Sequence, residues 1–306
     1  MTGLVKQNVV AIIVTHQPKL KEVFRLVDRL NHQVESIAVI DNGSTVDIGI
    51  DKTGHLIGAF ELIQLHENRG VAAAQNMGIQ LARSKQARAV LLMDQDSIPA
   101  PDMVTNLLSA MNQKKSEGER IAAVGPCFTD IKEDKFFPFA KLIGWRLCQV
   151  LCPENEVVEV GHLISSGCLI LLDVVDEIGG MEESLFIDYV DIEWCLRASR
   201  AGYKTFGVGS ARMIHDLGDS SINLWGRSFP VHTAQRYYYI VRNGIWLILQ
   251  NWVPINWKIA DTIRLIKIYI IFSLFAGSKF DNWIMMTKGL WHGITNQMGK
   301  FQPPKK

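Results

Sequence analysis

The sequence lacks several patterns that would assign it to common protein classes. No GxGxxG follows its first predicted strand, which argues against a dinucleotide-binding enzyme, and no GxxxxGK[ST] occurs, which excludes a P-loop enzyme. There are five cysteines, at positions 127, 148, 152, 168 and 195, with no metal-type CxxC pair. We therefore expect the protein to work in a reducing compartment, with its cysteines as free thiols. No basic and apolar signal peptide opens the chain. These absences predict a cytoplasmic protein.

Charge is distributed unevenly along the chain. Its 306 residues are 48% hydrophobic and 21% charged, which is typical of a globular protein. The net charge of +1 combines −8 in residues 1–220, with 21 Lys/Arg and 29 Asp/Glu, and +9 in residues 221–306, with 11 Lys/Arg and two acids. A basic C-terminal part on an acidic body indicates that this part contacts something anionic.

Strand and helix patterns alternate along the first third of the chain. Such alternation is typical of an α/β fold, in which a mostly parallel sheet is covered by helices on both faces. Ligands bind at the carboxyl ends of the strands in sheets of this kind. The predicted strands are Val9–Thr15, Ser36–Ile40, Phe60–Leu65 and Ala89–Met93, and the predicted helices are Lys19–Asn31 and Ala72–Arg83.

Polar residues stand at the end of each predicted strand. Thr15 ends the first strand, Asp41 follows the second and Asn68 follows the third. Asp94 and Asp96 follow the fourth, so we expect all of these side chains to meet in one crevice. Asp41 can accept a hydrogen bond from a base N–H or a ribose hydroxyl, although a local Asx-turn explains it as well.

The two acids of Asp94-Gln95-Asp96 are expected to share one face of the strand, since successive residues point to opposite faces. Two adjacent carboxylates repel unless a cation lies between them or one is protonated. Hard oxygen ligands suit Mg²⁺ or Mn²⁺ that also holds substrate phosphates. A solvated strand end is the simpler alternative.

Longer motifs connect these residues to a known family. The segments are Thr15, Ile40-Asp41-Asn42-Gly43-Ser44, Asn68-Arg69-Gly70 with Asn76, Asp94-Gln95-Asp96, Gly179–Phe186 and Ile187–Arg197. Over residues 9 to about 245 the chain resembles the family 2 inverting glycosyltransferases of GT-A fold. Together with Arg236-Tyr237-Tyr238-Tyr239 and Arg242-Asn243, the motifs are most similar to bacterial rhamnosyltransferases of surface-polysaccharide (O-antigen or capsule) assembly. The resemblance implies that the nucleotide sugar is bound by Thr15, Asp41, Asn42, Ser44, Asn68, Gly70, Asn76, Asp94 and Gln95.

The same resemblance assigns the catalytic base. Aligned on Arg197, the catalytic aspartate is Asp191, and Val190 replaces the acid that precedes it in the family. Asp188 is a candidate to support the base in place of that acid. Inversion needs one base, on the face opposite the leaving group. As alternatives, Asp188 or Asp191 would be a helix N-cap, and Glu193 with Arg197 would form a structural i,i+4 salt bridge.

Metal, acceptor and diphosphate residues are implied in the same way. His215, after an expected edge strand at 211–214, matches the family's H-x-x-G-x-S and would hold Mg²⁺ or Mn²⁺ with Asp94 and Asp96. A histidine that is merely hydrogen-bonded is the alternative. A plain turn explains Ser166 and Gly167 nearly as well as an acceptor-side loop does. The implied acceptor-side residues are Ser166, Gly167, Glu193 and Trp194, and the implied diphosphate ligand is Arg242.

The segment from about residue 221 differs in kind from the rest. It contains six of the eight tryptophans, at 225, 246, 252, 257, 283 and 291. Its longest charge-free apolar stretch in 259–278, Ile268–Ser278, is eleven residues and too short to span a bilayer. A basic helix of this kind suits the headgroup region of an anionic leaflet, whereas a dimer interface or a packed core helix is the alternative. Asp261, Arg264 and Lys267 would form the polar face, and Ile268, Ile271, Phe272 and Phe275 would insert.

The sequence therefore predicts a GT-A catalytic domain over residues 1–220, with a nucleotide-sugar-binding half at about 1–98 and an acceptor half at 99–220. A helical, membrane-associating region follows at 221–306. We expect a cytoplasmic enzyme, peripheral at the inner face of the membrane, that moves L-rhamnose from dTDP-rhamnose to a polyprenyl-linked saccharide, with no nucleic-acid partner. A UDP-hexose donor is one alternative. A non-catalytic nucleotide-sugar-binding partner of a transferase is another, and the intact set Asp41, Asp94, Asp96 and Asp191 argues against it.

Overall fold

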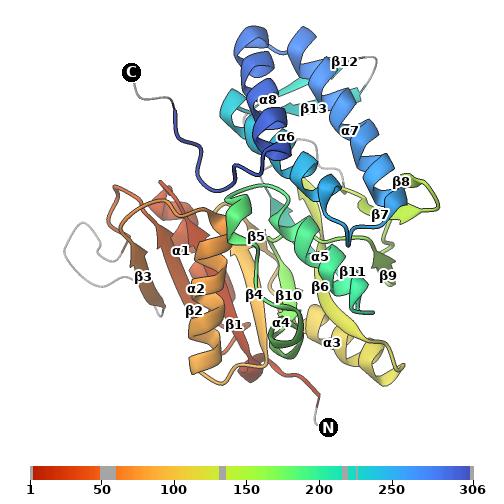
Figure 1. Cartoon of the computed structure of the whole chain (residues 1–306). Coiled ribbons are helices and arrows are strands. Elements are labelled where there is room, and N and C mark those ends of the chain that lie inside the picture. Colours follow the sequence, from red (N-terminus) through yellow and green to blue (C-terminus); the bar gives the residue numbers. More distant parts are fainter. Residues whose placement is uncertain (1–2, 49–59, 131–135, 216–219, 225–226, 304–306) are drawn as a thin grey trace.

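A central β-sheet organises the chain (Figure 1). The computed structural model describes residues 3–48, 60–130, 136–215, 220–224 and 227–303. The sheet has nine strands in the order β3-β2-β1-β4-β10-β6-β11-β5, and β9 pairs with β11. Its strands are β1 (Val9–Thr15), β2 (Ser36–Asn42), β3 (Glu61–Leu65), β4 (Ala89–Asp94), β5 (Ile98–Pro99), β6 (Ile121–Asp130), β9 (Val157–Val160), β10 (Cys168–Leu171) and β11 (Lys204–His215).

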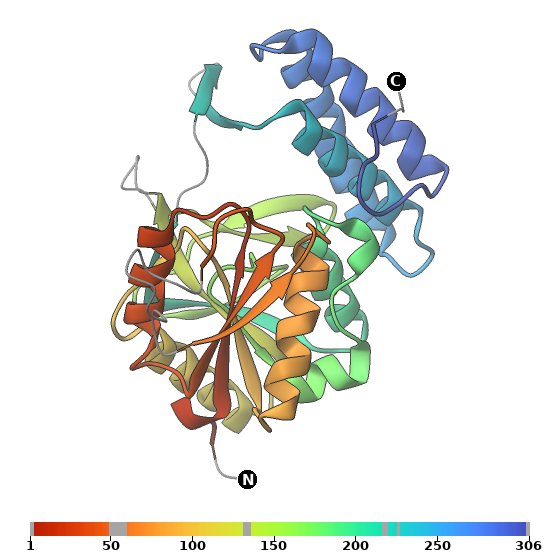
Figure 2. The ribbon, with the colours of Figure 1, turned by 90° about the vertical axis from the view of Figure 1, so that its left-hand side faces the viewer.

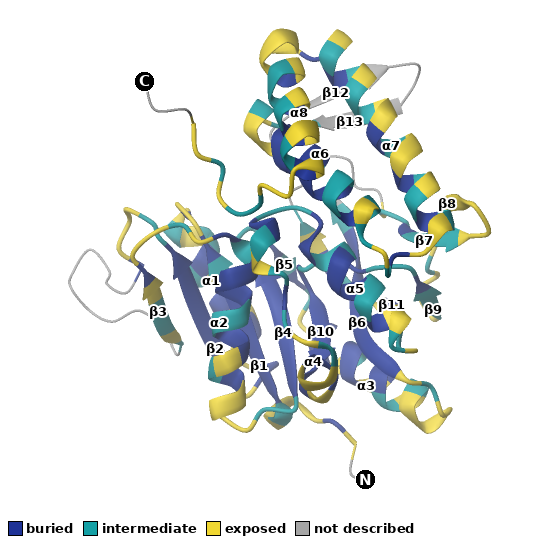
Figure 3. Ribbon diagram, viewed as in Figure 1, coloured by how far each residue is buried: buried dark blue, intermediate teal, exposed yellow. Residues whose placement is uncertain are grey.

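The first four strands of this order are parallel, so their carboxyl ends meet at one edge. The strand β10 then runs antiparallel to β4 and β6, while β6 and β11 are parallel. The register places Thr15 beside Asp41 and Val14 beside Asp94. The strands β1, β2 and β4 are buried along nearly their whole length and form the centre of the molecule (Figure 3). The mostly parallel α/β fold is confirmed.

Helices cover both faces of the sheet (Figure 2). The helices α1 (Leu20–Leu30) and α3 (Met103–Ser116) lie on one face, and α2 (Val71–Ser84), α4 (Leu172–Ile178) and α5 (Val190–Arg200) lie on the other. The helix α1 buries Val23, Leu26, Val27 and Leu30, which recur at helical spacing. The helix α2 lies close to β1 because Gly78 faces Ile12, where a Cβ atom would clash. Two short 3-10 helices, η1 (Lys6–Asn8) and η2 (Glu183–Leu185), complete this part.

Three helices follow the sheet and pack on one another above its edge (Figure 1). They are α6 (Ala234–Leu249), α7 (Ile255–Leu274) and α8 (Lys279–Ile294), with the hairpins β7 (Phe139–Ile143)–β8 (Arg146–Val150) and β12 (Ser220–Leu224)–β13 (Arg227–Val231) nearby. Gly289 lets α8 approach α6, since a Cβ atom there would lie 2.5 Å from the carbonyl oxygen of Tyr238. None of the helices in the described part of the chain combines the length and the hydropathy that crossing a bilayer requires. Trp225 and positions 216–219 of the histidine motif lie outside the described residues.

Two predictions about individual elements are wrong. Residues 211–214 do not form an edge strand, since they belong to β11, which pairs with β6 on one side and with β5 on the other. The predicted orientation of the helix α7 is also wrong, since Asp261 and Phe272 are buried and five of its seven isoleucines are exposed. Ile268 and Ile271, which were expected to insert into the membrane, are half-buried against the other C-terminal helices. Asp261 tolerates burial because its carboxylate accepts hydrogen bonds from Tyr189 Oη and Arg264 Nε, each at 2.7 Å.

Candidate active site

A cleft of about 670 Å³ opens where the carboxyl ends of β1, β2 and β4 meet the loop before α5. The helices α6 and α7 contribute Arg236, Ile240 and Arg264 to its walls. It lies where parallel α/β sheets usually bind ligands. Of the predicted site residues, the cleft is lined by Asn42, Asn68, Gly70, Asp94, Gln95, Asp96, Asp188, Asp191 and His215.

Asp41 lies below the cleft floor and is 2% exposed. Its carboxylate accepts hydrogen bonds from the Thr15 hydroxyl at 3.2 Å, from the Ser44 N–H at 3.2 Å and from the Ser44 hydroxyl. The bond from the Ser44 N–H is a local loop contact, but it spans three residues, one more than the Asx-turn that was the alternative explanation for Asp41. The three residues therefore form a hydrogen-bonded group that holds the end of β2 in place.

The loop after β3 is fixed against that group. Asn42 Oδ1 accepts the Arg69 N–H at 2.8 Å, and its amide donates to Asn68 Oδ1 at 3.2 Å. Gly70 has a φ of 91°, and a Cβ atom there would lie 2.5 Å from the carbonyl oxygen of Phe186. Glycine is needed at this position both for the backbone conformation and for the close approach. These contacts join the loops after β2 and β3 to the loop before α5.

Three side chains that can bind a divalent cation gather at the end of β4. Asp94, Asp96 and His215 each place a ligand atom within 4.8 Å of the others. His215 Nε2 lies 4.0 Å from Asp94 Oδ2, and its Nδ1 lies 3.5 Å from Asp96 Oδ1. Two carboxylates and an imidazole form a donor set that suits Mn²⁺ or Mg²⁺. The residues present fit such an ion.

The surroundings of this trio hold it in place. Ser97 Oγ lies 2.9 Å from His215 Nδ1 and 2.5 Å from Ser166 Oγ, and Ser166 accepts the Asp94 N–H at 3.2 Å. Burial raises the pKa of the Asp94 carboxyl, against the lowering influence of His215, and the negative charge of Asp96 raises it further. A bound cation would remove this cost by stabilising both carboxylates.

The loop before α5 has an unusual backbone. Phe186, Asp188 and Tyr189 have φ values of 66°, 62° and 65°, in the left-handed region that residues with side chains seldom adopt. The side-chain amide of Asn243 donates to the carbonyls of Leu185, Ile187 and Asp188 at 3.0, 2.7 and 2.9 Å. These bonds hold the strained backbone in one conformation.

Asp191 stands in the first turn of α5 and lines the cleft. Burial raises the pKa of its carboxyl to about 6, against the lowering effect of the hydrogen bond from the Ile192 N–H, and the charges of Asp188 and Asp94 raise it further. The N-cap residue of α5 is Tyr189, with no side-chain capping bond, so neither aspartate acts as a helix cap. A carboxylate with this pKa is ionised at neutral pH and still basic, which suits a general base.

Asp188 forms an ion pair with Arg236 at 3.2 Å. Burial raises the pKa of the Asp188 carboxyl, and Arg236 opposes that rise. Among the described residues its second oxygen, Oδ2, is buried without a hydrogen-bond partner. That oxygen can accept a hydrogen bond from a hydroxyl group in the cleft.

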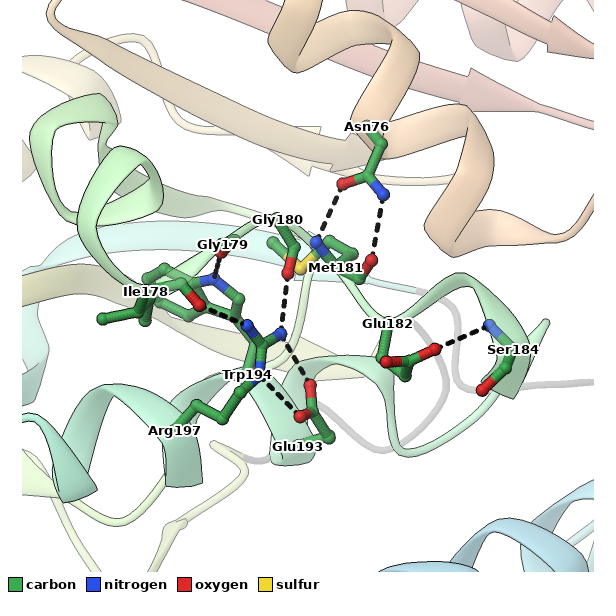
Figure 4. A network of polar contacts seen from close by, with 10 residues as sticks. All are labelled: Asn76, Ile178, Gly179, Gly180, Met181, Glu182, Ser184, Glu193, Trp194 and Arg197. Carbon is green, nitrogen blue, oxygen red and sulfur yellow. Dashed lines mark hydrogen bonds and ion pairs between the residues drawn. The ribbon is translucent and has the colours of Figure 1, made fainter. Parts of the chain in front are cut away.

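Several predicted site residues lie outside the cleft, in a structural network (Figure 4). Both carboxylate oxygens of Glu193 accept hydrogen bonds from Arg197, at 2.6 and 2.8 Å, which is the structural i,i+4 salt bridge left as an alternative. Trp194 is buried and donates to the Gly179 carbonyl at 3.1 Å. Asn76 exchanges hydrogen bonds with the backbone of Met181. All of these side chains fix the 178–185 segment under α5.

Arg242 also lies outside the cleft. It is fully buried and donates to the carbonyls of Leu185 and Gly299 at 2.8 and 2.5 Å. Its guanidinium is therefore bonded to backbone carbonyls and does not line the cleft, where the sequence placed it as a diphosphate ligand. Ser166 and Gly167 lie beneath the cleft wall, while their neighbour Ser165 lines it.

The cleft also contains residues that were not predicted to belong to it. Arg236 and Arg264 supply its positive charge, and His16 and His162 line it. The signal for Arg236 was present, because it opens the Arg-Tyr-Tyr-Tyr motif, but no spacing rule connects it to β4. The sequence placed Arg264 on the polar face of a membrane-associating helix. Helical periodicity shows which residues share a face, but it does not show which face is buried.

A parallel sheet with two acids after β4, a facing histidine and a basic carboxylate across the cleft is the arrangement of a GT-A glycosyltransferase. Residues 10–179 match the sequence profile described as glycosyl transferase family 2. The chain belongs to this family, and it is a glycosyltransferase.

Individual relatives agree with this placement. The chain is 34% identical over 258 residues to the dTDP-rhamnosyl transferase RfbF of Shigella flexneri, covering 84% of this chain and 85% of that protein. It is 24% identical over 155 residues to the low-salt glycan biosynthesis hexosyltransferase Agl10 of Haloferax volcanii, covering 48% of this chain and 46% of the relative.

A solved structure of GalNAc-T7 with UDP, GalNAc and Mn²⁺ superposes with a TM-score of 0.57. The match covers 94% of this chain and 56% of that one, at 14% sequence identity. At this identity the match shows the GT-A fold alone.

Proposed function

We propose that this glycosyltransferase moves L-rhamnose from dTDP-rhamnose, with inversion, to a saccharide carried on a polyprenyl lipid at the inner face of the cytoplasmic membrane. The observation that carries the transfer chemistry is the meeting of two groups in one cleft, namely the Asp94, Asp96 and His215 trio and the Asp191 carboxylate. The relative from Shigella flexneri, a dTDP-rhamnosyl transferase, supports the choice of donor.

Asp191 acts as the base. It accepts the proton of the acceptor hydroxyl while that oxygen forms a bond to the anomeric carbon. The bond between that carbon and the nucleotide diphosphate breaks on the opposite face, so a single displacement inverts the configuration. The raised pKa of Asp191 leaves it ionised at neutral pH and basic enough to take the proton.

Asp94, Asp96 and His215 would hold Mg²⁺ or Mn²⁺, whose charge stabilises the departing diphosphate. Arg236 lies on the same cleft and supports that role, since its guanidinium can donate to phosphate oxygens and its charge acts on Asp94. It takes the place that the sequence assigned to Arg242.

Asp188 orients the reactants. Its Oδ1 is held by Arg236, and its Oδ2 is available for a sugar hydroxyl on the donor or the acceptor. Asn42, Asn68 and Gln95 line the nucleotide end of the cleft. Asn42 and Gln95 fix the backbone of Arg69 and His16 there, and the side-chain amide of Asn68 can donate to a base or a ribose.

A panel of nucleotide sugars tests the proposal. The purified protein is incubated with Mn²⁺ and with dTDP-rhamnose, UDP-glucose, UDP-galactose or UDP-GlcNAc, and release of the nucleoside diphosphate is measured. We expect the highest kcat/KM for dTDP-rhamnose. Preferential turnover of a UDP-hexose would replace the donor, and turnover of none of these sugars by the folded protein would contradict the proposal.

A further inference from the structure

The helix α7 has two faces of different character. Its inward face buries Trp257, Asp261, Leu265 and Phe272. Six apolar side chains at intervals of four, four, three, four and four residues occupy the outward face and are 41–63% exposed. At 1.5 Å per residue this stripe is roughly 28 Å long. Its members are Ile255, Ile259, Ile263, Ile266, Ile270 and Leu274.

A second exposed apolar element adjoins the start of α7. The β7–β8 hairpin presents Ile143, Trp145 and Leu147, which are 58%, 59% and 41% exposed. The two elements are joined, since Asn256 Nδ2 donates to the Gly144 carbonyl at 2.9 Å. Figure 1 shows the hairpin beside the lower end of α7, and Figure 3 shows exposed residues along both. Leu147 pairs with Leu142 and Ile143 pairs with Arg146, so Leu147 and Ile143 lie on opposite faces of the hairpin. We call the six-residue stripe, together with Ile143 and Trp145, the α7 face.

The two segments that carry the α7 face contain almost only positive charges. Residues 136–152 and 254–278 contain a single acid, Asp261, which is buried and paired with Arg264. The charges left at the surface include Arg146, Lys258 and Lys267. An anionic lipid headgroup complements such a border, whereas a second copy of the chain would bring another set of lysines to it.

We propose that the α7 face docks on an anionic lipid bilayer, with the isoleucine stripe at the boundary between headgroups and acyl chains and Trp145 at the interface. The helix lies along the surface and does not cross the bilayer. Partly exposed isoleucines supply a salt-insensitive part of the binding, and Arg146, Lys258 and Lys267 supply a part that salt weakens.

Docking in this orientation leaves the cleft about one helix diameter, roughly 10 Å, from the membrane. Arg264, on the inward face of the same helix, lines the cleft, so the cleft and the bilayer lie on opposite sides of α7. The reason for docking, access to a lipid-linked acceptor, rests on the proposed function. The docking itself is a property of the surface and is measured without any acceptor.

Vesicle co-sedimentation tests this proposal. The full chain is mixed with phosphatidylcholine vesicles that contain or lack phosphatidylglycerol, at low and at high salt. We expect stronger binding to the vesicles with phosphatidylglycerol, and a residual binding at high salt. Ile266→Glu should weaken partitioning roughly tenfold or more, and Lys267→Glu roughly fivefold or more.

Val5→Glu is the matched control. Val5 is 52% exposed and Ile266 is 53% exposed, but Val5 precedes β1, at the opposite edge of the sheet from the cleft. The control should bind vesicles like the wild type. Donor hydrolysis should be unchanged in all three variants, and this separates a failed docking face from a failed active site.

Two results would overturn the proposal. One is a wild type that ignores phosphatidylglycerol and sediments as a dimer that Ile266→Glu converts to a monomer, since the α7 face is then a contact between copies. The other is an equal loss of vesicle binding in Ile266→Glu and Val5→Glu.

Discussion

Asp191 must be ionised to act as a base, so the acid side of the pH–activity profile reports its pKa. With a pKa of about 6, roughly one tenth of Asp191 is ionised at pH 5 and roughly nine tenths at pH 7. The expected result is a fall in kcat/KM of about tenfold between about pH 7 and pH 5, measured by donor hydrolysis at saturating metal. An aspartate with the ordinary pKa of 3.8 would lose only about one twentieth of its ionised form over this range.

Two variants and one control make this assay specific. Asp188→Asn removes a negative charge that raises the pKa of Asp191, so the acid limb should move to lower pH. Asp191→Asn should lower turnover by roughly a hundredfold or more and abolish the limb, while donor binding persists. Because loss of bound metal would also produce an acid limb, the metal concentration is varied, and the midpoint should stay in place. Constant activity from about pH 7 to pH 5 would refute the role of the raised pKa.

Three further predictions follow from the contacts around the cleft. Chelation by EDTA should abolish transfer and Mg²⁺ or Mn²⁺ should restore it, while Asp96→Asn should lose most activity with little change in unfolding temperature; full activity in chelator would contradict the metal site. Asn243→Ala removes the amide that donates to three carbonyls of the strained loop. The change should cost roughly 2–4 kcal/mol of unfolding free energy and lower kcat more than it changes KM. An unchanged denaturation midpoint would show that the strained loop does not depend on Asn243. Arg197→Ala leaves Glu193 buried without its ion pair and should cost roughly 3–5 kcal/mol, measured by denaturant unfolding; a loss of activity in a fully stable protein would instead indicate an acceptor-binding role.

The sheet could be predicted because each of its central strands carries a local signal. The strand β1 begins and ends where its apolar run does, and the polar residues that follow β2 and β4 lie at one edge. Parallel topology brings strand ends together whatever the loops do, so Asp94, Asp96 and Asn68 could be assigned to one crevice from sequence alone.

The opposite wall of the cleft could not be predicted in the same way. Arg236 reaches Asp188 from a helix that starts 46 residues later in the chain, and no periodicity encodes that contact. Arg242 carries the same charge and lies six residues further along, but it faces inward to the backbone of the strained loop. Only packing distinguishes the two arginines.

Which face of α7 is buried could not be predicted from its composition. A polar set of Asp261, Arg264 and Lys267 on one side of an apolar helix predicts a solvent-facing stripe. Asp261 and Arg264 instead satisfy each other and Tyr189 inside the protein, so burying them leaves no unpaired charge. Five of the seven isoleucines of α7 are then outside, where only a partner or a bilayer would cover them.

Inverting transfer in this cleft can be tested directly by one measurement. Purified protein is incubated with dTDP-rhamnose, Mn²⁺ and a lipid-linked saccharide fraction, and the anomeric configuration of the new glycosidic bond is determined by NMR. The single-base displacement predicts a product of opposite configuration to the donor, with none formed by Asp191→Asn. A product that retains the donor configuration, or one that Asp191→Asn forms at the wild-type rate, would contradict the mechanism.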